Sequence, residues 1–246
     1  MMKKGLVCFD MDGVLVDWLS TWEWVYSKLN LSNAESMELY KSGNLTEWEW
    51  LIRDISLIRS ALKENMKDNV IRELLEDCPL MNGYQVCIQS LLDHNFEVAI
   101  ISGGMQHVAY KVASKFPTDT HWSRRWGGMD RKIAIEEMNG RDTRLHVFCN
   151  GWYSNSEGEI SQTGRYNVQM NSKDTIVNML QRRLEIPVAR TASIGDSKGD
   201  ISMFNVSELS IAFNPMDEDV VDNADLTIKI KDLGIVANKI INHFDR

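Results

Sequence analysis

One short apolar run that ends in two aspartates limits the folds open to this chain more than any other feature. The run, residues 6–9, has the length and composition of a buried strand, and Asp10 and Asp12 follow it, with Gly13 at the turn. A strand buried on both faces cannot hold two carboxylates in its middle, because unpaired buried charge is too costly. Taken alone, the run also fits a strand end capped by solvated aspartates. In an open parallel sheet, however, this edge is where ligands bind.

Further apolar runs along the chain alternate with segments of helical spacing. The runs interpreted as strands are 97–101, 145–149, 192–196, 209–213 and 226–230. The segments expected to be helical are 84–94, 105–116, 173–184 with Ser172 as its N-cap, and 233–244. A hairpin is expected within 150–164. Strands that alternate with helices are typical of a covered parallel sheet, so the expected fold class is α/β, a Rossmann-like three-layer parallel sheet.

Residues 18–78 have a different character, because no strand pattern appears and apolar residues recur at helical spacing. Thr46 and Glu49 have the spacing of a helix-capping box. We therefore expect a small helical cap at 18–78, inserted after the first strand into a core formed by 1–17 and 79–246.

Five tryptophans cluster in this expected cap. They are Trp18, Trp22, Trp24, Trp48 and Trp50. The favoured interpretation is that they build the core of the cap, since a small subdomain needs bulky anchors. The alternative is an aromatic cage for a cationic or ring-shaped substrate.

Composition narrows the partners and the compartment. A formal net charge of −8 argues against a nucleic-acid partner, whose affinity comes largely from Lys and Arg. No apolar run approaches the roughly 20 residues of a membrane span, and the start of the chain does not read as a signal peptide. The 4 cysteines have no metal-like spacing, so a reduced, cytoplasmic protein is expected.

The polar segment 117–144 is interpreted as an insertion. Its tryptophans are a candidate homodimer contact, and the oligomeric state stays open.

Polar groups follow three of the expected strands, where parallel packing would bring them to one edge of the sheet. They are Asp10 and Asp12, then Ser102-Gly103-Gly104, then Asp196 with Asp200 just beyond. Carboxylates gathered there would repel one another without a cation, and hard oxygen ligands of this kind suit Mg²⁺. Residues 102–104 offer a hydroxyl and backbone N–H groups at an expected helix start, and Lys173 adds a positive charge. Together these groups favour phosphoryl transfer.

The same residues resemble the motifs of the haloacid dehalogenase-like phosphatases and, within them, of the phosphoserine phosphatase-like branch. Residues 10–16 (DMDGVLV) look like the first motif, 102–104 the second, Lys173 the third and 195–200 (GDSKGD) the fourth. The resemblance covers most of the chain apart from 117–144. It implies a Mg²⁺-dependent phosphatase with a cap over a Rossmann-like core.

The resemblance also implies roles for individual residues. Asp10 would be the nucleophile that forms an aspartyl-phosphate, and Asp12 the general acid and then the base. Ser102, Gly103 and Lys173 would hold the phosphoryl oxygens. The Mg²⁺ ligands would be Asp10, Asp196 and the backbone carbonyl of Asp12, with Asp200 in or behind that ligand shell. Arg53 matches the cap arginine that meets a substrate carboxylate, although Arg59 competes with it.

Two departures from the branch bear on the site and its substrate. Gly199 stands where the branch usually has Asn, and Leu19 stands where it has an acidic residue for the substrate ammonium; Asp17 is two positions away. The expected function is hydrolysis of a small phosphorylated metabolite, with a phosphoserine-like substrate as the leading hypothesis. The alternatives are a phosphotransferase with the same aspartyl-phosphate and a non-catalytic phosphometabolite-binding protein. Dehalogenase chemistry is disfavoured because Asp12 and the metal carboxylates belong to phosphoryl transfer.

Overall fold

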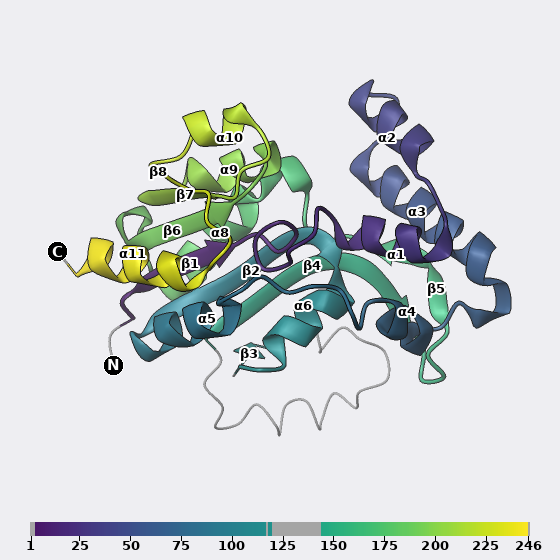
Figure 1. Cartoon of the computed structure of the whole chain (residues 1–246), viewed down its shortest axis with the longest axis horizontal. Helices are drawn as coiled ribbons and strands as arrows, with labels where there is room; N and C mark the ends of the chain where they lie inside the picture. The colour runs from purple at the N-terminus through teal and green to yellow at the C-terminus, as the bar shows by residue number, and fades with distance from the viewer. Residues whose placement is uncertain (1–2, 117, 120–143, 246) are drawn as a thin grey trace.

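The structure is a computed structural model, and it describes residues 3–116, 118–119 and 144–245. Its centre is a sheet with the strand order β3-β4-β2-β1-β6-β7-β8 (Figure 1), in which all pairs along this order are parallel; β5 pairs antiparallel with β4. The strand bounds are β1 Gly5–Phe9, β2 Phe96–Met105, β3 Thr118–Asp119, β4 Leu145–Ser154, β5 Ile160–Arg165, β6 Thr191–Gly195, β7 Leu209–Phe213 and β8 Leu226–Ile228. The expected α/β class is confirmed.

Helices cover both faces of the sheet, as the near-continuous apolar strands require. One face packs against α5 (Tyr84–Asp93), α6 (Gln106–Ala113) and α11 (Gly234–Phe244). The other packs against α8 (Asp174–Leu184), α9 (Ile201–Phe204) and α10 (Glu218–Asp222). In β1, Val7 and Phe9 join the first core while Leu6 and Cys8 join the second, because side chains alternate along a strand.

Two local expectations about the core were wrong. Ser172 does not cap the helix that follows, because it lies in a 3-10 turn (η3, Met170–Ser172) and Lys173 occupies the N-cap position of α8. The amide of Lys173 donates instead to Ser202 Oγ at 3.0 Å. Strand β2 also does not end at Ile101 but continues to Met105, with a shift of register against β4.

The expected cap segment is helical. Its helices are α1 Thr21–Leu29, α2 Ala34–Lys41, α3 Glu47–Leu62 and α4 Asp68–Leu74, grouped at one end of the molecule (Figure 1). The Thr46–Glu49 capping box is present at the start of α3. The cap rests on the β4–β5 hairpin, because Arg59 donates from α3 to the carbonyls of Ile160 and Ser161 at 3.0 and 2.8 Å. The exact domain limits, 18–78 against the rest, stay a prediction.

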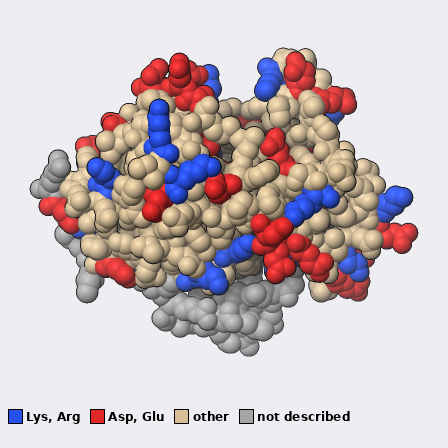
Figure 2. All heavy atoms as spheres, in the orientation of Figure 1, with Lys and Arg blue, Asp and Glu red and all other residues tan. Residues whose placement is uncertain are grey.

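On the surface, the face drawn in Figure 2 carries acidic and basic side chains side by side. Within the described residues, no helix is long and apolar enough to cross a bilayer. All four cysteines are free and buried. The expected cytoplasmic location stays a prediction, and the proposed insertion at 117–144, apart from β3 and Arg144, lies outside the described residues.

Candidate active site

The loop after β1 holds the first two aspartates at the carboxyl edge of the sheet. The amide of Asp10 still donates to Ile194 O of β6 at 2.9 Å, so its backbone is fixed by the sheet. The chain then turns back on itself, with the Met11 carbonyl accepting from the amides of Leu15 and Val16. Gly13 has a φ of +77°, and a Cβ there would lie 1.9 Å from Asp196 Oδ2. Only glycine therefore lets the β1 and β6 ends approach so closely.

Lys173 lies at the centre of the site, between two carboxylates. Its Nζ is 2.8 Å from Asp10 Oδ1 and 2.6 Å from Asp200 Oδ1, and all three side chains are buried. Burial alone would lower the pKa of Lys173, but the two carboxylates raise it above its ordinary value. The lysine is therefore charged, and it places a fixed positive charge beside Asp10.

Three carboxylates gather around this single lysine. Asp10, Asp196 and Asp200 each offer an oxygen, and these atoms lie within 4.8 Å of one another. Burial, and then the charge of Asp200, raises the pKa of Asp10 to about 6; burial, and then the charge of Asp10, raises the pKa of Asp196 to about 9. Negative charge thus exceeds positive charge here. An oxygen donor set with such an excess fits a hard divalent cation such as Mg²⁺.

Asp200 is held more firmly than the other two carboxylates. Its Oδ2 accepts from the amides of Asp196 and Ser197 at 3.0 and 3.1 Å, while its Oδ1 faces Lys173. Both oxygens are therefore already engaged, so Asp200 is suited to position Lys173 and the loop of Asp196.

Asp12 is supported by a residue that the sequence reasoning missed. Its Oδ2 accepts from the amide and the hydroxyl of Thr21, at 3.0 and 3.1 Å, and the Thr21 hydroxyl oxygen accepts from the Met105 amide. Burial, and then the charge of Asp10, raises the pKa of Asp12 to about 7. A carboxyl with that pKa can give and take a proton near neutral pH. The available signal was a hydroxyl residue at the start of the first cap helix.

The expected anion site at 102–104 differs from its prediction. These residues belong to the extended end of β2, and α6 begins only at Gln106, so they are not at a helix N-terminus. The amide of Gly104 donates to Ser102 Oγ at 3.0 Å. A Cβ on Gly104 would lie 2.6 Å from Asp12 Oδ2, so this segment does reach the aspartate site.

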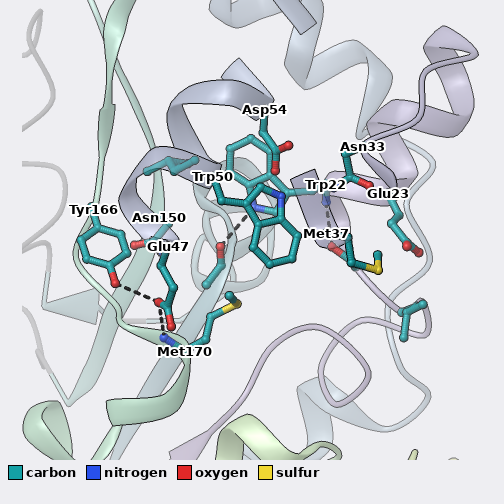
Figure 3. Close-up of a pocket in the computed structure, with 14 residues that line it drawn as sticks. Trp22, Glu23, Asn33, Met37, Glu47, Trp50, Asp54, Asn150, Tyr166 and Met170 are labelled. Atoms are coloured by element: carbon teal, nitrogen blue, oxygen red, sulfur yellow. Dashed lines mark hydrogen bonds between the residues drawn. The ribbon is translucent and has the colours of Figure 1, made fainter. Parts of the chain in front are cut away.

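A cavity of about 250 Å³ opens beside Gly103, between the cap and the core. Figure 3 shows its walls: Trp22, Glu23, Trp50 and Asp54 come from the cap, and Tyr166 and Met170 from the core. The indole of Trp22 donates to Gly103 O at 3.1 Å. The cavity therefore borders the segment expected to hold phosphate.

The tryptophans divide between the two interpretations. Trp22 is buried and Trp24 packs against the main core, as a structural role requires. Trp22 and Trp50 also line the cavity. Trp18 and Trp48 are 43% and 42% exposed, so for these two the interpretation as core anchors was wrong.

The structure does not bring the expected specificity residues to the cavity. The side chain of Arg53 is 48% exposed and lies 3.8 Å from Glu35. Arg59 is used by the β5 carbonyls, and Asp17 pairs with Lys231 at 2.6 Å. Leu19 does line the cavity, although it cannot meet an ammonium group.

Comparison with known proteins gives concordant matches. The family model of haloacid dehalogenase-like hydrolases matches residues 144–240. The chain is 26% identical to a phosphoserine phosphatase of Wolinella succinogenes, over 94% of this chain and 97% of that one. It is 25% identical to a phosphoserine phosphatase of Methanocaldococcus jannaschii, over 94% and 95% of the two chains. A solved structure described as a phospho-aspartyl intermediate analogue of phosphoserine phosphatase shares the fold, with a TM-score of 0.65 at 22% identity, over 98% of this chain and 99% of that one.

The parallel sheet, the clustered aspartates and these matches support a haloacid dehalogenase-like hydrolase. Within that class, the curated relatives, which the chain matches over nearly its whole length, support a phosphatase of the phosphoserine phosphatase-like kind.

Proposed function

We propose that the protein is a Mg²⁺-dependent phosphomonoesterase that acts on a small phosphorylated metabolite through an aspartyl-phosphate. The observation that carries this proposal is Lys173, which bridges Asp10 and Asp200 inside a group of three carboxylates. The description of a related structure as a phospho-aspartyl intermediate analogue supports the same chemistry.

The first half-reaction uses both aspartates of the first loop. An Asp10 carboxylate oxygen attacks phosphorus, and the bond from phosphorus to the ester oxygen breaks. The carboxyl of Asp12 gives its proton to that oxygen, so the product leaves as a neutral alcohol. Ser102, Gly103 and Lys173 are the proposed partners of the phosphoryl oxygens.

The second half-reaction returns the enzyme to its starting state. Asp12, now a carboxylate held by Thr21, accepts a proton from water as the water oxygen attacks phosphorus. The bond from phosphorus to Asp10 then breaks, which releases inorganic phosphate. The proposed Mg²⁺ ligands are Asp10, Asp196 and the backbone carbonyl of Asp12, with Asp200 behind them; when bound, the ion supplies positive charge that offsets the charge of the phosphoryl group.

The cap is proposed to exclude water and to select the leaving group. Glu47 of α3 accepts from the Tyr166 hydroxyl and the Met170 amide of the core, each at 2.8 Å, so the cap is fastened over the site. Since the named relatives are phosphoserine phosphatases, a phosphoserine-like substrate is the leading candidate. Arg53 is not part of this proposal, because its guanidinium group faces Glu35 outside the cavity.

The test is phosphate release from a panel of small phosphomonoesters, with and without Mg²⁺. The panel contains phosphoserine, phosphocholine, sugar phosphates, pyridoxal phosphate and the chromogenic ester p-nitrophenyl phosphate. We expect Mg²⁺-dependent turnover of at least one metabolite, and a loss of about 10³-fold or more in Asp10→Asn with its fold intact.

Asp17→Asn is the matched control, because Asp17 follows the same loop but pairs with Lys231 at the surface. Wild-type turnover in Asp10→Asn would refute the nucleophile assignment. A folded protein that releases phosphate from no ester, but transfers it to an added alcohol, would be a phosphotransferase.

A further inference from the structure

The cavity beside Gly103 carries acidic side chains and no basic one. Glu23, Glu47 and Asp54 line it, and no Lys, Arg or His is among its described lining residues. The aspartate site, which Gly104 approaches at Asp12, contains Lys173. A substrate that spans both would therefore meet positive charge at one end and negative charge at the other.

Asp54 is the clearest sign that a ligand is expected here. It is only 6% exposed, it belongs to the cavity wall, and among the described residues its Oδ1 has no hydrogen-bond partner of good geometry. Burial raises the pKa of Asp54 to about 6, although the polar groups of Tyr26 and Asn33 oppose that effect. The group is thus mainly ionised at neutral pH. A buried carboxylate without a cationic partner is unfavourable, and a cationic ligand would supply that partner.

Glu47 adds a second fixed carboxylate. It accepts hydrogen bonds from the hydroxyls of Tyr40 and Tyr166 and from the Met170 amide, at 3.1, 2.8 and 2.8 Å. These three donors are neutral, so they orient the carboxylate without cancelling its charge.

Aromatic rings complete the walls between these carboxylates. Trp22, Trp50 and Tyr166 line the cavity, and Figure 3 shows Trp50 close to Asp54, with Tyr166 bonded to Glu47. The face of an indole attracts a cation, and aromatic walls with nearby carboxylates are typical of sites for organic ammonium groups. The volume of about 250 Å³ corresponds to about eight water molecules, which suits a short leaving group.

We propose that this cavity binds the ammonium group of a phosphorylated amino alcohol and disfavours a substrate that also bears a carboxylate. The inference rests on the proposed phosphatase function, and it replaces phosphoserine, the leading candidate from the relatives, by an amino alcohol phosphate. The carboxylate of phosphoserine would face Glu23, Glu47 and Asp54, with no described basic side chain to receive it. Arg59, the remaining arginine candidate, is bound to carbonyls of β5.

Two matched substrate pairs test the proposal. Phosphoethanolamine lacks only the carboxylate of L-phosphoserine, and n-propyl phosphate replaces the ammonium of phosphoethanolamine by a methyl group. We expect kcat/KM for phosphoethanolamine to exceed that for each of the other two by about 100-fold. Equal or better turnover of phosphoserine would overturn the inference while leaving the phosphatase proposal intact.

A variant pair tests the assigned residues. Asp54→Asn should reduce the ratio of kcat/KM for phosphoethanolamine over n-propyl phosphate by about 10-fold, mainly through KM. Glu35→Gln, which removes an exposed cap carboxylate outside the cavity, should leave that ratio unchanged. An unchanged ratio in Asp54→Asn would overturn the assignment.

A binding measurement tests the cavity assignment independently of the phosphatase proposal. Calorimetric titration of Asp10→Asn with phosphoethanolamine and with phosphoserine requires no turnover. If the wild-type protein hydrolyses no ester, but the variant binds phosphoethanolamine more tightly than phosphoserine, the phosphatase proposal is refuted and the cavity assignment is supported. Tighter binding of phosphoserine would refute the cavity assignment whether or not the protein is a phosphatase.

Discussion

Two groups of carboxylates lie near the carboxyl end of β2, and they are built differently. Asp10, Asp196 and Asp200 surround a buried lysine at the end of the sheet. The cavity group, which contains Asp54, faces indoles and a tyrosine, with no basic residue in the described part of its wall.

The difference shows that aspartates can contribute to binding sites for ligands of opposite charge. Around Lys173, a fixed positive charge and an oxygen donor set suit a phosphoryl group together with a metal ion. Around Asp54, negative charge next to indole faces suits an organic cation. Burial raises the pKa of Asp10 and of Asp54 alike, so it is the neighbouring groups, and not burial, that separate the two sites.

Replacing the lysine should give the largest effect, because it would remove the feature that distinguishes the catalytic group. We expect Lys173→Gln to lower kcat/KM by about 10²- to 10³-fold, since a fixed charge near the transferring group is lost. Without Mg²⁺ it should also lower the free energy of unfolding by about 3–5 kcal/mol, because breaking a buried ion pair leaves carboxylates uncompensated. Thermal unfolding with and without Mg²⁺ measures this, and added Mg²⁺ should raise Tm more in the variant than in the wild type.

Lys198→Gln is the control for that substitution. Lys198 lies in the fourth motif and pairs with Asp219 at 2.9 Å, but the pair is at the surface. It should change neither the rate nor the Mg²⁺ dependence of Tm. A Lys173→Gln protein with wild-type activity would mean that the lysine does not hold the phosphoryl group.

The catalytic group could be predicted from the sequence because its parts are local. Each strand is a short apolar run, each acidic residue follows one directly, and parallel strands bring their ends together whatever the loops do. The spacing from Asp10 to Asp12 needs only the turn at Gly13. The structure accordingly brings Asp10, Lys173, Asp196 and Asp200 together, while their chemical roles remain proposals.

The cavity could not be predicted in the same way, because it depends on how separate elements pack. Periodicity shows that α3 is helical but not which of its residues faces the core, so Arg53 was expected where Asp54 lies. The β4–β5 hairpin decides that rotation: a Cβ on Gly164 would lie 2.7 Å from Leu51, so α3 packs closely against the hairpin. Two of the three partners of Glu47, Tyr166 and Met170, are more than a hundred residues away.

A smaller effect is expected for the stability of Asp54→Asn. It would show that the Asp54 carboxylate, unlike those around Lys173, lacks a cationic partner. The pKa of Asp54 is about 6 in the fold, above its ordinary value of 3.8, so its ionisation opposes folding. The penalty is absent below the unfolded pKa and is complete only above the folded one. We therefore expect Asp54→Asn to raise the free energy of unfolding by up to about 2–3 kcal/mol at pH 8 and by less at pH 5.

Urea denaturation at the two pH values measures this difference, with Glu35→Gln as the exposed control. A destabilised Asp54→Asn at pH 8 would indicate that the carboxylate already has a cationic partner within the protein. The cavity would then need no ligand to complete it. A stabilised variant with weaker discrimination between substrates would instead identify Asp54 as a residue kept for binding at the expense of stability.

The smallest effect is expected for Arg53→Ala, which tests most directly whether the cap supplies a basic side chain to the cavity. The guanidinium group is half exposed, and its ion pair with Glu35 is long, at 3.8 Å. Its loss should change stability by no more than about 0.5 kcal/mol. The ratio of kcat/KM for phosphoethanolamine over phosphoserine should stay within about 2-fold of the wild type, because a group outside the cavity makes no difference between the two transition states.

A variant that lost phosphoserine turnover selectively would show that Arg53 moves into the cavity during catalysis. The cap would then supply a positive charge of its own, and the division between a cation-bearing catalytic group and a purely acidic cavity would not hold in the working enzyme.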